Sequence, residues 1–347
     1  MARWDPGYLR THDGRPSTPS WVTAGARPAV TGYGNGAGRP TALRHRALLY
    51  RAADELDAAA TSFAAEGLGS GEGVVVALPD DVAERVRHGL GPSAEDVAFL
   101  DTAAVYTRPG WALACYQREV EDRTAGGRPL RVISQPDRRG SPSPEADAWA
   151  SIDAAVNASF ASAPLTLLCP YDVSDLDPAV LADARRTHPE LVDGGTPRTS
   201  PHYTDPALFC TRHRSAPLAP LPPPIDQLAF TAPTLSSLRR LVRGHGERAG
   251  LAPERVTELV LAVNEAATNS IRHAGGSGLL RITRTPGEVL CDVIDAGVIT
   301  APLAGLVPPA GAGDGSYGLW MIHQLCDLVE IRSGSTGTTV RLHVTCP

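Results

Sequence analysis

The chain has 347 residues, enough for about two domains with cores of their own. Its formal net charge is −6, and all 32 basic residues are arginine because the sequence contains no lysine. A Walker A phosphate loop requires a lysine and Schiff-base catalysis requires an amine side chain, so both are excluded. The acidic balance also argues against direct nucleic-acid binding, which needs a basic face on the folded part.

The cysteines predict reduced thiols and a cytoplasmic location, because they are scattered and form no CxxC pair. Cys210 and His213 form a lone C-x2-H, which is more typical of a chance pair than of a zinc site. We find no signal peptide and no long apolar run, so we expect no membrane association. The six cysteines are Cys115, Cys169, Cys210, Cys291, Cys326 and Cys346.

Residues 1–41 are rich in Gly, Pro, Arg and Thr without periodicity, which predicts a disordered tail. The first 46 residues hold seven Arg against two Asp, and we interpret this stretch as a solvated basic arm. A helical period begins at "RALLYRAADELDAAATSFAAEGL", residues 46–68. This predicted helix, with its first turn, carries His45 and Tyr50.

Residues 42–210 are predicted to form an α/β domain with a mainly parallel sheet, because strands alternate with helices. Gly71 and Gly73 precede the first strand, but without lysine they cannot form a phosphate loop. The predicted strands lie within 73–79, 96–103, 129–136 and 164–172, and the predicted helices within 110–123, 147–161 and 177–191.

Residues 211–226 are predicted to be a linker, since "SAPLAPLPPPIDQ" is a Pro-rich, semi-rigid spacer. The last segment, 227–347, is long enough for one domain. Its helices would lie on one face of a mixed or antiparallel sheet, as an α/β sandwich. The predicted strands are 227–232, 278–285, 288–295, 328–334 and 337–344, and the predicted helices are 234–250, 253–274 and 316–327.

The helix 253–274 carries polar residues beyond its packing stripe. Glu265 and Asn269 lie one turn apart on one face. An Asn oxygen suits Mg²⁺, and a Glu can orient or deprotonate a nucleophile. Alone, this pair is far more typical of a solvated helix face.

Three glycine-containing motifs follow. Asp295 and Gly297 lie where a strand stops, in "DVIDAGV". A Gly-rich loop, "GAGDGSYGLWMI", leads into a helix and would expose N–H groups and a helix dipole to phosphate. Gly337 and Thr338 form a tight turn before the last strand. Taken singly, each motif is an ordinary turn or hairpin.

The order and spacing of these motifs resemble the GHKL (Bergerat-fold) ATPase family. "NEAATNSIRHA" looks like its N-box, "DAG" and "GDGSYGL" like its glycine boxes, and "GTT" like its last motif. Within this superfamily the segment is most similar to anti-sigma-factor serine/threonine kinases. The resemblance covers residues 225–347, and a Pro-rich spacer stands where a histidine kinase would have its dimerisation helices.

The resemblance implies ATP and Mg²⁺ as cofactors. Asn269 would ligate Mg²⁺, and Glu265 would act as base toward the attacking hydroxyl or position it. Asp295 would accept from the adenine amino group, with Thr338 nearby through water. The glycines that would shape the lid around the phosphates are Gly297, Gly313, Gly315 and Gly318.

Other polar residues keep two interpretations. His273 is typical of this branch, and packing at the helix end is as compatible with it as catalysis. Arg272 or Arg281 could add positive charge in a chain without lysine. The lid departs from the family pattern because its glycines are separated and the frequent Arg is missing, which leaves catalytic competence open.

The first domain resembles the MEDS sensory domain, a RecA-like α/β module without a working phosphate loop. The resemblance rests on "HRALLY", "AAEGLGSGEGVVVALP", "DAWASIDAAVNASF", "LTLLCPYD" and "THPEL...SPHY". It implies a small organic ligand. The pocket could be lined by His45, Tyr50, Cys169, Tyr171, Asp172 and His188, although Cys169 also fits a core and His188 a helix end.

Together these resemblances imply a cytoplasmic, signal-responsive anti-sigma regulatory factor. It would bind ATP–Mg and a sigma factor, or phosphorylate an anti-anti-sigma (STAS-type) partner on Ser/Thr, or do both, and a homodimer is compatible with this. The alternatives are a catalytically inactive nucleotide-binding module that acts by association only, and an orphan sensor histidine kinase-like ATPase.

Overall fold

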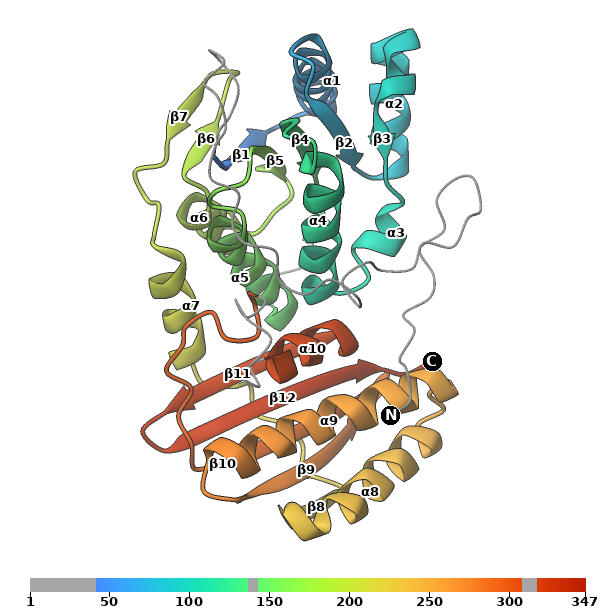
Figure 1. Cartoon of the computed structure of the whole chain (residues 1–347), viewed down its shortest axis with the longest axis vertical. Helices are drawn as coiled ribbons and strands as arrows, with labels where there is room; N and C mark the ends of the chain where they lie inside the picture. Colours follow the sequence, from blue (N-terminus) through green and yellow to red (C-terminus); the bar gives the residue numbers. More distant parts are fainter. Residues whose placement is uncertain (1–41, 137–142, 308–316) are drawn as a thin grey trace.

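The computed structural model describes residues 42–136, 143–307 and 317–347. The predicted tail, 1–41, and two of the predicted lid glycines, Gly313 and Gly315, lie outside these ranges. Figure 1 shows two sheet-based units stacked along the longest axis of the molecule. Among the described residues, no helix combines the length and the apolar character needed to cross a bilayer.

The N-terminal unit is built on a seven-stranded sheet with the order β3-β2-β4-β5-β1-β6-β7. Every neighbouring pair is parallel except β6 and β7, so the predicted mainly parallel sheet is confirmed. The strands are β1 (Arg44–Tyr50), β2 (Gly73–Ala77), β3 (Ala98–Phe99), β4 (Leu130–Ser134), β5 (Leu165–Asp172), β6 (Glu190–Val192) and β7 (Pro197–Thr199).

The prediction that a helix begins at residue 46 is wrong, because residues 44–50 form the central strand β1 between β5 and β6. Its run of small and large apolar residues is buried on both sides, and such a short run does not distinguish strand from helix by period. The helix α1 starts only at Ala53. Consequently His45 and Tyr50, five apart on a strand, point to opposite faces of the sheet.

Helices cover both faces of this sheet (Figure 1). One apolar layer joins Leu48 and Val76 to α1 (Ala53–Gly69) and α2 (Asp80–Leu90). The other joins Ala47 and Leu167 to the helices of the opposite face. These are α4 (Pro109–Thr124), α5 (Pro144–Ser159), α6 (Pro178–Thr187) and α7 (Pro206–Ser215), and the short helices η2 (Gly91–Asp96) and α3 (Thr102–Val105) connect strands.

The C-terminal unit is an antiparallel sheet of five strands with the order β11-β12-β10-β9-β8, which confirms the predicted sandwich. Helices α8 (Leu235–Arg248), α9 (Pro253–His273) and α10 (Tyr317–Leu325) pack on one face, and η3 (Ala232–Thr234) precedes α8. The strands are β8 (Asp226–Thr231), β9 (Ser277–Thr285), β10 (Glu288–Asp295), β11 (Leu328–Gly334) and β12 (Gly337–Thr345).

The other face of this sheet carries a buried polar layer. Arg341 donates to both carboxylate oxygens of Asp292, at 2.8 and 3.0 Å, and His343 lies 3.0 Å from Glu330. Arg341 also donates to the carbonyl of Ala219 at 2.7 Å. The extended segment 216–225 therefore covers this layer, while α7 takes up the first part of the predicted linker, residues 211–215.

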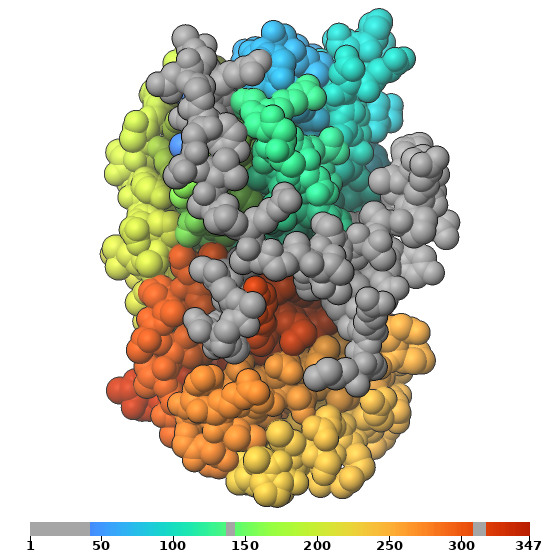
Figure 2. All heavy atoms as spheres, viewed as in Figure 1, coloured from blue at the N-terminus to red at the C-terminus, as the bar shows by residue number. Residues whose placement is uncertain are grey.

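Figure 2 shows the two units meeting in one continuous body, with α8 (yellow) at the end remote from the N-terminal sheet. Helix α10 faces the N-terminal unit and contacts α4, while β11 contacts α5 and α7. The lid helix of the C-terminal unit is thus also the element that meets the other unit.

Candidate functional site

The polar face of α9 meets the start of α10 at a glycine. Glu265 and Asn269 are partly buried and flank Ala266 and Ala267, which belong to the core stripe of the helix. Gly318 is buried against them: a methyl group there would lie 3.1 Å from Asn269 Nδ2 and 3.3 Å from Glu265 Oε2. The missing side chain therefore lets the lid helix approach the carboxylate and the carboxamide.

Asp295 points toward α9 because it shares the side-chain alternation of Val293, which packs under the helices. Its Oδ2 accepts a hydrogen bond from Ser270 Oγ at 2.6 Å. Its Oδ1 accepts from the Gly297 backbone N–H at 2.8 Å. A carboxylate has about four lone-pair sites, so Asp295 keeps acceptor capacity for a ligand.

Thr338 fixes the turn after Asp295. Its hydroxyl donates to the Gly297 carbonyl at 2.8 Å. Ser333 Oγ accepts from the Ile299 N–H at 2.8 Å and lies 2.8 Å from Thr338 Oγ1. Because the Thr338 hydroxyl already donates to Gly297, the Ser333 hydroxyl donates to Thr338. The hydroxyl proton of Thr338 is therefore committed to the protein, and the oxygen can only accept from a neighbouring water.

The described residues fit a magnesium-bound nucleotide. A hard amide oxygen and a carboxylate lie on one face of α9, and Asp295 offers a fixed acceptor at the end of β10. Gly297 packs closely against the end of α9, since a methyl group there would lie 2.6 Å from Ala274 Cβ. Gly318 packs in the same close way against Asn269 and Glu265.

The additional polar residues are less well placed. His273 and Arg272 are exposed in the last turn of α9. Arg281 lies between Leu280 and Ile282, which point into the helix layer, so its side chain is on the opposite face of the sheet. Arg281 therefore does not serve this site.

The far end of α10 is held by the N-terminal unit. Arg108, at the start of α4, donates to the carbonyls of Gln324 and Leu325 at 2.6 and 3.1 Å. It also lies 3.2 Å from a Glu258 oxygen and 3.4 Å from an Asp327 oxygen. These charge-assisted contacts are stronger than neutral hydrogen bonds and neutralise the guanidinium where it is largely buried.

Close backbone packing accompanies this ion cluster. The Gln324 side chain donates to the Gly110 carbonyl at 3.0 Å. A methyl group at Gly110 would lie 2.3 Å from the His323 carbonyl oxygen, so only glycine permits this approach. Burial, together with the charge of Arg214, lowers the pKa of His323 to about 3. The imidazole is accordingly neutral at the contact near pH 7.

Four of the six predicted pocket residues of the first unit come together. His45, Cys169, Tyr171 and His188 lie on the face of the sheet that α5 covers. Tyr50 packs into the opposite layer because it lies on a strand and not on a helix. Asp172, at the end of β5, follows Tyr171 and therefore points away from that face.

Comparison with protein families assigns both units. Residues 228–344 match the model of the histidine kinase-like ATPase domain. Residues 44–189 match the model "MEDS: MEthanogen/methylotroph, DcmR Sensory domain". The chain joins a MEDS domain to a histidine kinase-like ATPase domain. The two recognised resemblances are thereby confirmed at the level of the domains.

Similarity to individual proteins is weaker. No curated protein matches the chain. Among solved structures it is similar to the RsbU and RsbW domains of Rv1364c from Mycobacterium tuberculosis, with 20% identity over 36% of this chain and 34% of that one, at a TM-score of 0.27. It is also similar to the Acinetobacter baumannii histidine kinase AdeS, with 11% identity over 40% of this chain and 73% of that one, at a TM-score of 0.24. The chain thus spans about a third of the mycobacterial structure.

Sequence reasoning missed three residues of these sites. Ser270 orients Asp295 in the ATPase domain, and its position directly after Asn269 in the N-box is the one sequence signal for it. Asp153 joins the buried cluster of the MEDS domain, and a carboxylate inside the apolar stretch of α5 could have indicated it. Arg108 connects the domains, and nothing in its local sequence distinguishes it.

Proposed function

We propose that the chain is a signal-responsive anti-sigma regulatory factor, in which the MEDS domain controls a Mg–ATP-dependent kinase domain. The observation that carries this proposal is the position of α10. One end of this nine-residue helix packs against Glu265 and Asn269. At the other end, Arg108 donates a hydrogen bond to the helix and Gly110 packs against it. A change in the MEDS domain can therefore reach the nucleotide site through one short helix.

The proposed chemistry is phosphoryl transfer to a Ser or Thr hydroxyl of a partner. Mg–ATP supplies the phosphoryl group and, in a chain without lysine, most of the charge neutralisation. Asn269 presents its amide oxygen to the metal, and Glu265 orients or deprotonates the attacking hydroxyl. Asp295, held by Ser270 and the Gly297 N–H, accepts from the adenine amino group.

In this proposal the lid would comprise Gly297 and Gly318 together with Gly313 and Gly315, which lie outside the described residues, and Thr338 would fix the adjoining turn. The proposed partner is a sigma factor that the domain holds inactive, an anti-anti-sigma protein of the STAS type that it phosphorylates, or each in turn. The proposed location is the cytoplasm, which agrees with six cysteines that form no disulfide with one another. The MEDS domain would receive a small organic ligand.

A catalytically inactive module is the second candidate, and the lid sequence favours it. "GDGSYGL" separates the glycines and lacks the Arg of the compact pattern. In this case ATP would be a structural or switching ligand, and regulation would act through association alone. An orphan histidine kinase is less compatible, since an extended segment, 216–225, directly precedes the ATPase domain.

Labelled ATP separates the two candidates. The full chain is incubated with purified STAS-type proteins and sigma factors of its host, captured beforehand on the immobilised chain. The kinase proposal predicts label on a partner Ser or Thr, and about a 100-fold loss in Glu265→Gln with ATP binding kept. Glu254→Gln, exposed in the first turn of the same helix, is the matched control. ATP binding without transfer to any captured partner would rule out the kinase and leave the inactive module.

A further inference from the structure

A second group of chemically reactive side chains lies in the MEDS domain, far in sequence from the nucleotide site. It consists of His45 on β1, Asp153 on α5, Cys169 on β5 and His188 at the end of α6. All four side chains are buried, and their donor atoms lie within 4.8 Å of one another. Four separate elements therefore bring two imidazoles, a thiol and a carboxylate to one point.

The hydrogen-bond network fixes the tautomer of His45. The Asn157 amide donates to the Thr187 carbonyl at 2.7 Å, so its oxygen faces His45 Nδ1, 3.1 Å away, and must accept. Nδ1 consequently carries the proton and Nε2 the lone pair. His45 Nε2 lies 3.5 Å from Cys169 Sγ. This is about the N-to-S edge of a tetrahedron with bonds of about 2.0 and about 2.3 Å, the lengths in zinc sites.

His188 is fixed in the same way. Its Nδ1 donates to the Ala184 carbonyl at 2.9 Å, which leaves the lone pair on Nε2. Its ring lies 4.0 Å from the ring of His45, centroid to centroid, and 5.5 Å from that of Tyr171. Metal-binding histidines typically donate their other ring N–H to a carbonyl or carboxylate in this manner.

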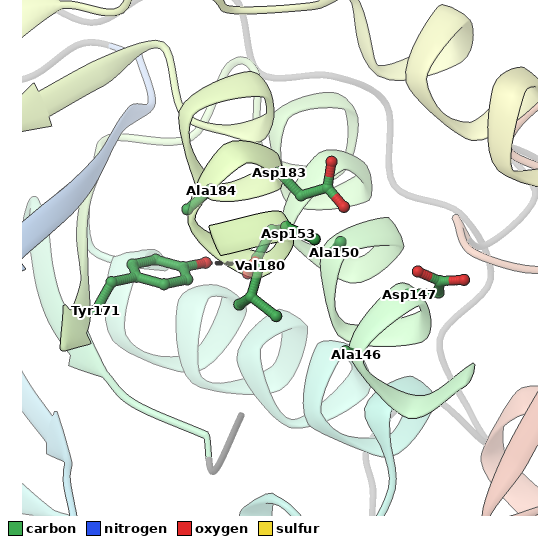
Figure 3. Close-up of a pocket in the computed structure, with 9 residues that line it drawn as sticks. Ala146, Asp147, Ala150, Asp153, Tyr171, Val180, Asp183 and Ala184 are labelled. Carbon is green, nitrogen blue, oxygen red and sulfur yellow. Dashed lines mark hydrogen bonds between the residues drawn. The ribbon is translucent and has the colours of Figure 1, made fainter. Parts of the chain in front are cut away.

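Asp153 is held by a neighbour of the cluster. The Tyr171 hydroxyl donates to Asp153 Oδ2 at 2.7 Å and so orients this carboxylate (Figure 3). Metal-bound carboxylates are commonly oriented by such second partners. Each of the three residues besides Cys169 thus has a partner that orients it.

A cavity between α5 and α6 reaches Asp153, one of the four residues of the cluster. It is lined by Asp153 and Tyr171 on one side and by Asp147 and Asp183 on the other (Figure 3). Its volume is about 20 Å³, above the roughly 10–15 Å³ that one water or ion needs. The carboxylates that line this cavity would attract a cation.

We propose that His45 Nε2, Cys169 Sγ, Asp153 and His188 Nε2 bind one divalent transition metal ion of the zinc type. Imidazole and thiolate ligands favour such metals over Mg²⁺ and Ca²⁺. Binding would form four metal–ligand bonds from ligand lone pairs and release the Cys169 thiol proton to solvent, without change of oxidation state. In the metal-free chain the Cys169 S–H donates to His45 Nε2 instead.

Cobalt titration tests this proposal on the full chain after chelator treatment. We expect one Co²⁺ per chain, a thiolate-to-cobalt charge-transfer band in the near ultraviolet, intense visible bands of tetrahedral Co²⁺, and their loss when Zn²⁺ is added. Cys169→Ser should remove the charge-transfer band. Cys115→Ser, at a buried cysteine of α4 in the same domain, should keep it.

Tyr171→Phe protects the test against misfolding, because it removes only the hydroxyl that holds Asp153. It should weaken Co²⁺ binding about tenfold while circular dichroism stays unchanged. The proposal is overturned if the folded chain binds no Co²⁺, or if Cys169→Ser gives the wild-type spectrum. Neither outcome depends on nucleotide, so the test is independent of the proposed kinase activity.

Discussion

At the scale of single residues, strand alternation decides which polar groups lie at the proposed nucleotide site. Asp295 and Thr338 share the parity of the core residues Val293 and Val340, so the sequence pattern alone places them under α9. The same rule removes Arg281 from the site. Ser270 could not be predicted in its role, because its bond to Asp295 depends on how α9 crosses β10 and not on local pattern.

Gly337 gives a prediction at this scale. Its φ is +119°, and a methyl group there would lie 2.2 Å from the Asp295 carbonyl oxygen. Gly337→Ala should lower the free energy of unfolding by at least about 2 kcal/mol, since backbone strain and the clash add. Urea unfolding measures this. Gly334→Ala, in the same hairpin with open space around it, should change it by less than about 0.5 kcal/mol.

At the scale of elements, α10 connects two sites that sequence reasoning treated separately. The helix itself was predicted, because its apolar period and the preceding glycines are local. Its docking on Arg108 and Gly110 was not, because contacts about 200 residues apart leave no periodic signal. The error at β1 has a related cause: "ALLY" is apolar on both faces, and only its place between β5 and β6 makes it a strand.

Breaking the Arg108 cluster should uncouple the domains. Arg108→Ala leaves Glu258, Asp327 and two α10 carbonyls without this donor, and we expect a loss of about 2 kcal/mol in the free energy of unfolding. Calorimetry should then resolve two transitions where the wild type shows one. Arg123→Ala, which removes an exposed pair with Glu119 on α4, should keep a single transition. A single unchanged transition in Arg108→Ala would contradict the coupling.

Because His323 is buried at the same contact, we expect the free energy of unfolding to depend on pH. Burial lowers its folded-state pKa to about 3, whereas the unfolded value is about 6.5. Below about pH 6.5 the unfolded chain binds a proton that the folded chain does not, so stability falls as pH falls. The loss attributable to this group should reach about 2 kcal/mol at pH 5.

Comparing His323→Gln with the wild type at pH 7.5 and pH 5 measures this contribution by urea unfolding. The variant should lose about 2 kcal/mol less than the wild type on acidification. His273→Gln, at an exposed position of α9, should follow the wild type. Parallel curves for His323→Gln and wild type would contradict the assignment.

At the scale of the whole molecule, a MEDS domain contacts α10 of a histidine kinase-like ATPase domain (Figures 1 and 2). The order of the domains and both sheet types could be predicted, because apolar runs and Pro-rich breaks are features of the sequence. The buried cluster of the MEDS domain could be predicted only in part, since Asp153 joins it through the packing of α5 on β1 and β5. The proposed partners are matters of surface recognition, which the sequence pattern does not encode.

Magnesium-dependent ATP binding tests the central claim most directly. In isothermal titration of the full chain with Mg–ATP, the account predicts one site per chain and binding at least about tenfold weaker, or about 1.4 kcal/mol, in Asn269→Ala. Asn264→Ala, on the same helix but bonded to Arg239, should bind as the wild type does. Wild-type affinity in Asn269→Ala, with magnesium dependence intact, would contradict the account.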